Sequence, residues 1–280
     1  MNIKDVNRIL GIHPALVDRE LPSDGRTFHL MSDPDLPFED LPMDEAELRF
    51  SDGMRLLKKG DIQNGRRLLE EAYKMGNLEA GNCLALGLKH GWFGDRDYET
   101  AAKIFRKLAH KGESNAMNFY AFAYKDGLGV KKSIYWSEFW LLKAIEKGNL
   151  CAAATYGQLI IENVYPKQSK SLGLWLLFWA ADNGVASAMN DIGLCYEEGV
   201  GMHVDYKKAF EWFKKAVDYG GGACAEFNLS RCYRYGLGEE IDYEQADAWQ
   251  NLAIEHGFDM DAYNKAHCLD MDFLDEVYDF

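Results

Sequence analysis

Apolar and polar positions along most of the chain alternate with the spacing of helices that bury one face. The two clearest stretches are Ala188, Ile192, Cys195 and Tyr196, at i, i+4, i+7 and i+8, and Ala209, Trp212, Phe213 and Ala216, at i, i+3, i+4 and i+7. Because an α-helix has about 3.6 residues per turn, each set lies on one face of a helix. The pattern therefore predicts pairs of amphipathic helices through the middle of the chain.

These helix pairs recur with a period that is marked most clearly by glycines. The series is Gly76, Gly112, Gly148, Gly184 and Gly220, each 36 residues after the last, followed by Gly257 after 37. A fixed period of this length is typical of solenoids built from stacked helical hairpins. We therefore predict an all-α, right-handed α/α solenoid of about six helix-turn-helix repeats with a period of 36 residues, preceded by a non-repeat arm and followed by a cap.

Residue types at the ends and centres of the predicted helices fit this arrangement. Glycines follow the helices, where positive φ is common, and Asp97, Asp205 and Asp242 precede second helices, where an N-cap acceptor is favourable. Small residues at the predicted crossings let the two helices of a hairpin approach closely. Large residues are expected to fill the space between repeats, namely Ile104, Trp140, Leu176, Trp212 and Trp249.

Residues 188–216, with Gly193, the Gly199-Val-Gly201 turn and Trp212, resemble a Sel-one-like repeat, the longer-looped branch of the tetratricopeptide-like superfamily. This resemblance implies a helical scaffold that works as an adaptor in signalling, quality control or host–microbe contact.

The resemblance extends over about residues 46–260, which is six units, but two units depart from the pattern. The first, residues 46–79, has a shorter connection and resembles an ordinary tetratricopeptide unit. In the fourth, Asn163-Val-Tyr165-Pro166 replaces the Gly-x-Gly turn, so the geometry of that loop stays open.

Both ends of the chain differ from the repeats. Five of the six prolines lie in the first 42 residues, and residues 31–47 hold seven acids and no base. Residues 1–45 are therefore predicted to form an acidic, proline-rich N-terminal arm, and 46–260 the repeat solenoid. Residues 261–280 are predicted to form a C-terminal capping helix and acidic tail, with docking of a partner as the alternative role for the tail.

Charge and composition narrow the function classes. The chain has 280 residues, is 48% hydrophobic, and has a formal net charge of -14 with a pI near 5.0. Such a field repels nucleic acids and anionic membrane surfaces, so we predict neither as a partner. The longest apolar run, 172–181, is ten residues, about half a membrane span, and the start lacks the pattern of a secretory signal. A cytoplasmic location is expected.

The charge is unevenly distributed. Residues 51–150 carry a net charge of +5, whereas residues 151–250 carry -6. We hypothesise that the acidic segment 31–47 lies against basic side chains of the early repeats, leaving the later repeats and the tail free for a basic partner. The basic side chains are Arg66, Arg67, Lys103, Arg106 and Lys107.

Catalytic and metal-binding motifs are not found. The chain contains no HExxH, Walker-type glycine loop or Gly-x-Ser-x-Gly, and its glycine pairs recur with the repeat, as turns do. The six cysteines are scattered, without a CxxC, and are expected to be reduced and mostly buried. We predict no catalytic, metal or cofactor-binding residues and no enzyme activity.

A stripe on the first helices of the repeats is the candidate partner-binding surface. In tetratricopeptide-like hairpins these helices line the concave face, and asparagine can donate to and accept from an extended peptide backbone. The candidate residues are Asn82, Lys89, Asn118, Phe122, Lys125, Asn190, Leu194, Glu197, Arg231 and Arg234. The alternative for the asparagines is that they satisfy neighbouring helix ends.

These observations favour a non-catalytic protein-binding repeat protein. Its most specific form is a stoichiometric inhibitor or immunity protein that binds a basic protein or peptide. A multi-partner adaptor or scaffold in signalling or assembly is the alternative, and a small-molecule hydrolase is a second one. The oligomeric state is open.

Overall fold

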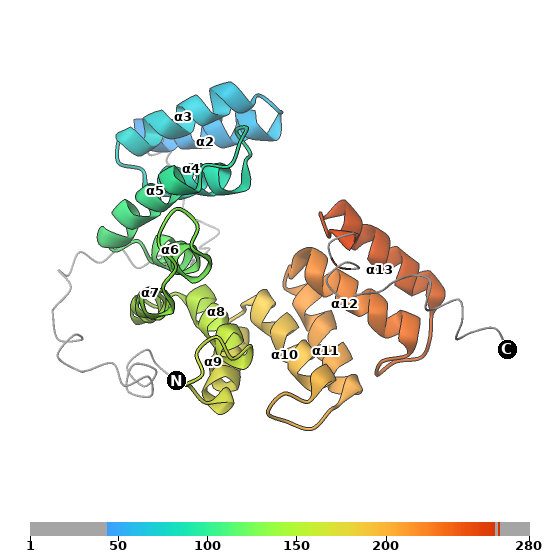
Figure 1. Cartoon of the computed structure of the whole chain (residues 1–280). Coiled ribbons are helices and arrows are strands. Elements are labelled where there is room, and N and C mark those ends of the chain that lie inside the picture. The colour runs from blue at the N-terminus through green and yellow to red at the C-terminus, as the bar shows by residue number, and fades with distance from the viewer. Residues whose placement is uncertain (1–43, 261–262, 264–280) are drawn as a thin grey trace, which may run out of the picture. The chain divides into compact units, whose positions relative to one another are not determined.

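The computed structural model describes residues 44–260 and Tyr263, which form twelve helices and contain no strand. The helices pair into six hairpins, as the 36-residue period predicts (Figure 1). An all-α helical repeat fold of the solenoid class is thereby confirmed. Most of the predicted N-terminal arm and C-terminal cap lies outside the described residues.

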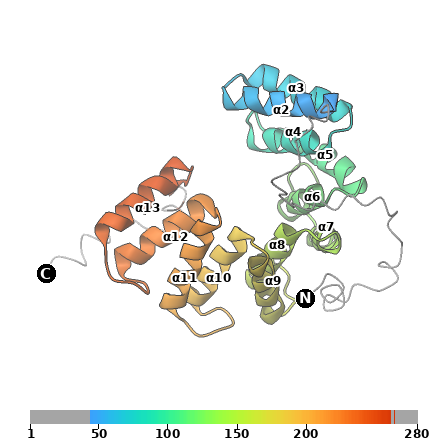
Figure 2. The same ribbon diagram turned by 180° about the vertical axis from the view of Figure 1, so that it is seen from behind.

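The chain divides into two compact units between Asn149 and Leu150. The first unit contains α2 (Glu45–Lys58), α3 (Ile62–Lys74), α4 (Leu78–His90), α5 (Tyr98–His110), α6 (Ser114–Asp126) and α7 (Ile134–Glu146). The second contains α8 (Leu150–Ile161), α9 (Lys170–Asp182), α10 (Ala186–Glu198), α11 (Tyr206–Asp218), α12 (Gly222–Tyr235) and α13 (Tyr243–Glu255). Within each unit every helix packs on the next one in the chain (Figure 2).

Helix ends are fixed by the residues that the sequence singles out. The Asp97 side chain accepts a hydrogen bond from the Thr100 amide at 2.9 Å, and Asp205 and Asp242 cap α11 and α13 in the same way. Glycine takes the left-handed conformation at the C-caps of α4, α6, α10 and α12. The predicted capping pattern is therefore confirmed.

The departing loop of the fourth repeat keeps the first of the two left-handed positions of the Gly-x-Gly turn, at Asn163, and lacks the second, at Tyr165. Asn163 has a φ of 61°, and it is the one non-glycine residue with positive φ in the described part of the chain. Asparagine tolerates this region better than most residues because its short polar side chain can hydrogen-bond locally. Asn163 thus replaces the usual glycine, and Tyr165 is buried against Tyr156, with ring centroids 5.2 Å apart.

Small residues lie where paired helices cross. A Cβ added at Gly157 on α8 would lie 2.8 Å from the carbonyl oxygen of Gly173 on α9, and a Cβ at Gly173 would lie 2.9 Å from that of Gly157. In the next hairpin, a Cβ at Gly193 would lie 2.5 Å from the ring of Phe213. These contacts explain the small-residue registers of the repeat.

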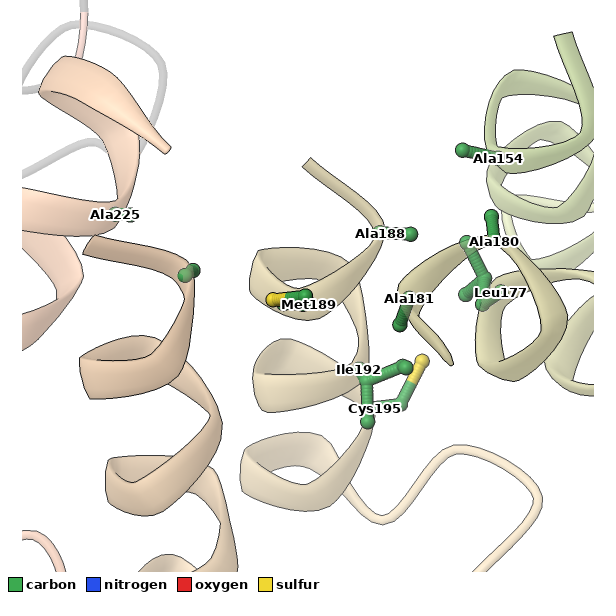
Figure 3. Close-up of a cluster of buried hydrophobic side chains, with 10 residues drawn as sticks. Ala154, Leu177, Ala180, Ala181, Ala188, Met189, Ile192, Cys195 and Ala225 are labelled. Carbon is green, nitrogen blue, oxygen red and sulfur yellow. The ribbon is translucent and has the colours of Figure 1, made fainter. Parts of the chain in front are cut away.

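The core of the second unit runs between successive repeats. Figure 3 shows Ile192 and Cys195 of α10 facing α9, while Met189 of the same helix points the opposite way, to the side on which Ala225 lies. Helix α10 therefore contributes to two layers of the core. Of the large residues predicted to fill these spaces, Ile104, Trp140 and Leu176 are buried, whereas Trp212 and Trp249 are half-buried and pack at the edges of core clusters.

Candidate functional site

The first helices of the repeats in the second unit line a groove of about 690 Å³. Helix α10 contacts α8 on one side and α12 on the other, and all three contribute side chains to the groove. Asn190, Leu194 and Glu197 lie at i, i+4 and i+7 and so share the groove-facing side of α10. Phe258 and Tyr263 complete the lining beyond α13.

A chain of polar contacts crosses the groove from α10 to α12. Arg231 donates from Nη2 to Oε1 of Glu197 at 2.5 Å and from Nη1 to Oδ1 of Asn228 at 3.2 Å. Asn228 in turn donates from Nδ2 to Oδ1 of Asn190 at 2.8 Å. Burial lowers the pKa of Arg231, but the neighbouring Glu197 carboxylate outweighs this effect and the pKa is raised overall. The network fixes the positions of four side chains in the groove.

Asp191 is the titratable group most altered by the groove. The pKa of its carboxyl is raised to about 7; burial is the main cause, an interaction with the Asn190 amide opposes the shift, and the nearby charge of Glu162 adds to it. Glu162 accepts a hydrogen bond from Nε2 of Gln158, another groove residue, at 3.0 Å. Asp191 is therefore a carboxyl that changes charge near neutral pH in a partly desolvated site.

Aromatic rings form one wall of the groove. The rings of Phe227 and Phe258 are stacked with centroids 4.1 Å apart, and Tyr263 meets Phe227 edge-on at 4.6 Å. Phe227 is buried, whereas Phe258 and Tyr263 are half-buried. The groove is therefore lined by aromatic rings as well as by carboxylates, which suits ligands with both apolar and charged parts.

The predicted candidate residues of the second unit fall into two groups. Asn190, Leu194, Glu197 and Arg231 all line the groove. Arg234 does not, because it is bonded within its own hairpin to Asp247 at 2.7 Å and to Gln250 at 3.0 Å.

In the first unit, the predicted asparagines are buried. Asn82 on α4 donates from Nδ2 to Glu113 at 2.9 Å, and Glu113 caps the start of α6. This contact matches the alternative in which asparagine satisfies a neighbouring helix end. Among the residues that the structure describes, the Oδ1 atoms of Asn82 and Asn118 are buried and have no hydrogen-bond partner. Buried polar atoms without a hydrogen-bond partner are uncommon in proteins. Binding of a partner by Asn82 and Asn118 stays a prediction.

The remaining predicted residues of the first unit form a cation–aromatic cluster. The Nζ atoms of Lys89 and Lys125 lie 5.9 and 5.8 Å from the centroid of the Phe122 ring. Lys125 also pairs with Asp126 at 2.8 Å. Two like charges share one ring, and Asp126 neutralises one of them.

Several groove residues were missed by the sequence analysis. Asp191 and Asn228 each lie one position beyond the residues that continue the asparagine register, so the repeat pattern does not mark them. The cysteines were expected to be mostly buried, but Cys224 is exposed at the groove and Cys83 is half-buried. Cys151 is exposed as well, whereas Cys195 and Cys232 are buried as predicted. Exposure of these thiols results from their place near the start of α8 and α12.

In residues 44–260 and 263, no three His, Cys, Asp or Glu side chains come together in a way that could hold a metal ion. Across the same residues, none of the helices combines the length and apolar character needed to span a bilayer.

Stacked helical hairpins whose first helices line a groove define a repeat protein of the protein-binding class. The particular family is given by the repeat itself. Residues 49–77, 83–113, 114–149, 186–219 and 225–258 match the Sel1 repeat, and the chain belongs to the Sel1 repeat family. The unmatched hairpin is α8–α9, in which Asn163 takes the place of the turn glycine.

Relatives and similar structures agree with this assignment. The human protein sel-1 homolog 2 is 29% identical over 180 residues, which are 63% of this chain and 21% of that protein. A Sel1 repeat protein from Oxalobacter formigenes is similar with a TM-score of 0.60 and 25% identity, over 81% of this chain and 66% of its own. The chain thus spans about a fifth of the human relative and just under two thirds of the bacterial one.

An immunity protein from Pseudomonas aeruginosa, PA5088, has the same fold. Its TM-score is 0.58 with 21% identity, over 87% of this chain and 94% of its own. A second immunity protein of that organism, Pa5087, is similar with a TM-score of 0.57 and 22% identity, over 79% of this chain and 84% of its own.

Proposed function

We propose that this chain acts by stoichiometric binding of a basic protein, as an inhibitor or immunity protein without catalysis of its own. The observation that carries the proposal is the charge of the second-unit groove. Its cation, Arg231, is neutralised by Glu197 at 2.5 Å. Asp191 and Glu198 line the same groove, and within the described residues neither has an ion-pair partner. The groove therefore has an excess of negative charge.

Two further observations support the proposal. The net charge of -14 favours encounter with a positively charged protein. Two proteins of the same fold are described as immunity proteins, and the similarity to each extends over more than three quarters of this chain.

Affinity capture from the native source with the tagged full chain, at low and high salt, tests this proposal. We expect one dominant basic protein that is lost at high salt. Mixing the purified pair should then give a 1:1 complex by light scattering and inhibit the partner's activity in proportion to the amount of chain added. Recovery of several salt-resistant partners, or a partner whose activity is unaffected, would contradict the inhibitor role.

A basic hollow in the first unit favours a second candidate function, that of an adaptor with two kinds of partner. This hollow, of about 490 Å³, is lined by Tyr73, Lys103, Arg106, Lys107, His110 and Lys111. Lys103 pairs with Glu99, and Arg66 and Arg67 pair with Glu70 and Glu71, so the remaining cations of α5 carry most of the free positive charge. An adaptor would bind an acidic protein here while the second unit binds a basic one. The predicted contact of this surface with the acidic segment 31–47 falls mostly on residues outside those described.

A further inference from the structure

We propose that the groove between α8, α10 and α12 binds an extended peptide segment of the partner and that Asp191 receives a lysine or arginine side chain of that segment. This inference rests on the proposed function, because it names the part of a basic partner that the second unit recognises. It also makes Asp191 the residue that determines specificity for a cation.

The shape and the lining of the groove favour an extended segment. Three successive repeats supply its walls, and its lining extends from Gln158 on α8 across α10 to Arg231 on α12. Its volume of about 690 Å³ is within the range of pockets that bury a drug-sized ligand, which corresponds to a few residues of peptide. An amphipathic segment would place apolar side chains on the wall of Phe227, Phe258 and Tyr263.

Charge complementarity selects a cationic side chain. The titratable groups that interact electrostatically with Asp191 are Glu162 beyond the end of α8, Cys195 on its own helix and Cys224 on α12. Glu197, Glu198 and Arg231 line the same groove. The only cation in this set is Arg231, and its guanidinium is held by Glu197 and Asn228. A lysine or arginine from a partner would compensate the desolvated Asp191 carboxylate, whereas an acidic side chain would meet two further carboxylates.

The same geometry makes binding depend on pH. The pKa of Asp191 is about 7, and burial raises the pKa of the Cys195 and Cys224 thiols above the usual value of 9.0, so both thiols stay protonated between about pH 6 and 8. Only the ionised carboxylate attracts a cation. Since the ionised fraction of such a group falls about tenfold between pH 8 and 6, affinity should fall by about that factor.

The test is selection of a random linear dodecapeptide library, displayed on phage, against the full chain at about pH 8. Peptides with lysine or arginine at a recurring position should be enriched, and the enrichment should be lost with Asp191→Asn and about tenfold weaker at pH 6. Asp218→Asn is the matched control, because Asp218 is an exposed residue of the same unit outside the groove. It should leave the selection unchanged.

A second readout locates the bound peptide. Cys224 and Cys151 are both exposed, but only Cys224 lines the groove. A selected peptide should slow alkylation of Cys224 and leave the rate at Cys151 unchanged. No enriched peptide, enrichment that Asp191→Asn leaves intact, or protection of both thiols alike would overturn the inference. A basic partner that is still captured and inhibited in those cases would leave the proposed function standing, so the two failures are distinguishable.

Discussion

Arg231 on α12 donates a hydrogen bond to Glu197 on α10 at 2.5 Å, so an ion pair joins the first helices of two successive repeats. Both side chains are mostly buried, with 23% and 13% of their surface exposed. The pair therefore stabilises the unit as well as shaping the groove, and it limits the free charge of the groove to the carboxylates that remain.

Removal of the Arg231 charge should destabilise the chain. Arg231→Met leaves Glu197 partly buried without its cation, and we expect a loss of about 2 kcal/mol, below the cost of breaking a fully buried pair. Arg234→Met is the control, since its partner Asp247 is 66% exposed and such pairs contribute less than about 1 kcal/mol. Urea unfolding measures the free energy of unfolding of both variants. Equal losses of stability would contradict the larger contribution of the Arg231–Glu197 ion pair.

Close packing at a hairpin crossing gives a second prediction. Gly157→Ala places a Cβ 2.8 Å from the backbone carbonyl of Gly173, which cannot rotate away. We expect a loss of about 2–3 kcal/mol, because overpacking moves the two helices apart. Gly148→Ala meets nothing within 4 Å, and its φ of 83° makes strain the only cost, about 1 kcal/mol. A smaller loss of stability for Gly157→Ala than for Gly148→Ala would show that α8 and α9 can move apart at little cost, and would contradict this prediction.

The aromatic residues of α11 should differ in their contribution. Phe213 is completely buried, and Phe213→Ala should cost about 3–5 kcal/mol because it leaves a cavity. The sequence favoured Trp212 for this role, but Trp212 is half-buried and contacts Phe178 at the edge of the core. Trp212→Ala should therefore cost less, about 2 kcal/mol. Thermal unfolding of the two variants measures both losses of stability. A larger loss for Trp212→Ala than for Phe213→Ala would support the sequence-based expectation.

Asp191 should make stability depend on pH. Its pKa is about 7 in the folded chain against an ordinary value of 3.8, so the folded state favours the protonated form. The contribution of the Asp191 carboxyl to the free energy of unfolding is therefore fully present below about pH 4 and is lost as the pH rises through about 7. Asp191→Asn should be more stable than the natural chain at about pH 8, by on the order of 2–4 kcal/mol, and the gain should shrink toward pH 4.

Unfolding midpoints at several pH values measure this dependence. Asp218→Asn provides the control, because Asp218 is exposed on the same unit and its replacement should give a small difference that does not change with pH. A constant difference for Asp191→Asn as well would mean that its carboxyl is not desolvated.

The local features of the fold could be predicted from the sequence. The period, the helix pairs and the caps at Asp97, Asp205 and Asp242 all depend on residues close together in the chain, so their signals repeat visibly. The geometry of the loop at Asn163 could not be predicted, because no sequence pattern indicates which residue adopts a positive φ in place of glycine.

The candidate site could be predicted only in part. Asn190, Leu194 and Glu197 share a helix face by their spacing alone, and they do line the groove. The bond from Asn228 to Asn190 spans 38 residues, because the longer turn at 220–222 adds one residue to the period and Asn228 lies one position beyond the asparagine register, so a fixed period misses it. The burial of Asp191 and the pairing of Arg234 with Asp247 depend on neighbouring helices, which no local pattern reports.

The most direct test of the central claim is titration calorimetry of the captured basic partner into the full chain at low and high salt, with Asp191→Lys and Asp218→Lys compared with the natural sequence. We predict a 1:1 complex that weakens with salt, is at least about tenfold weaker with Asp191→Lys, and is little affected by Asp218→Lys. Equal loss of affinity with both variants would assign binding to overall charge, and unchanged affinity with Asp191→Lys would contradict a role of the second-unit groove in partner binding.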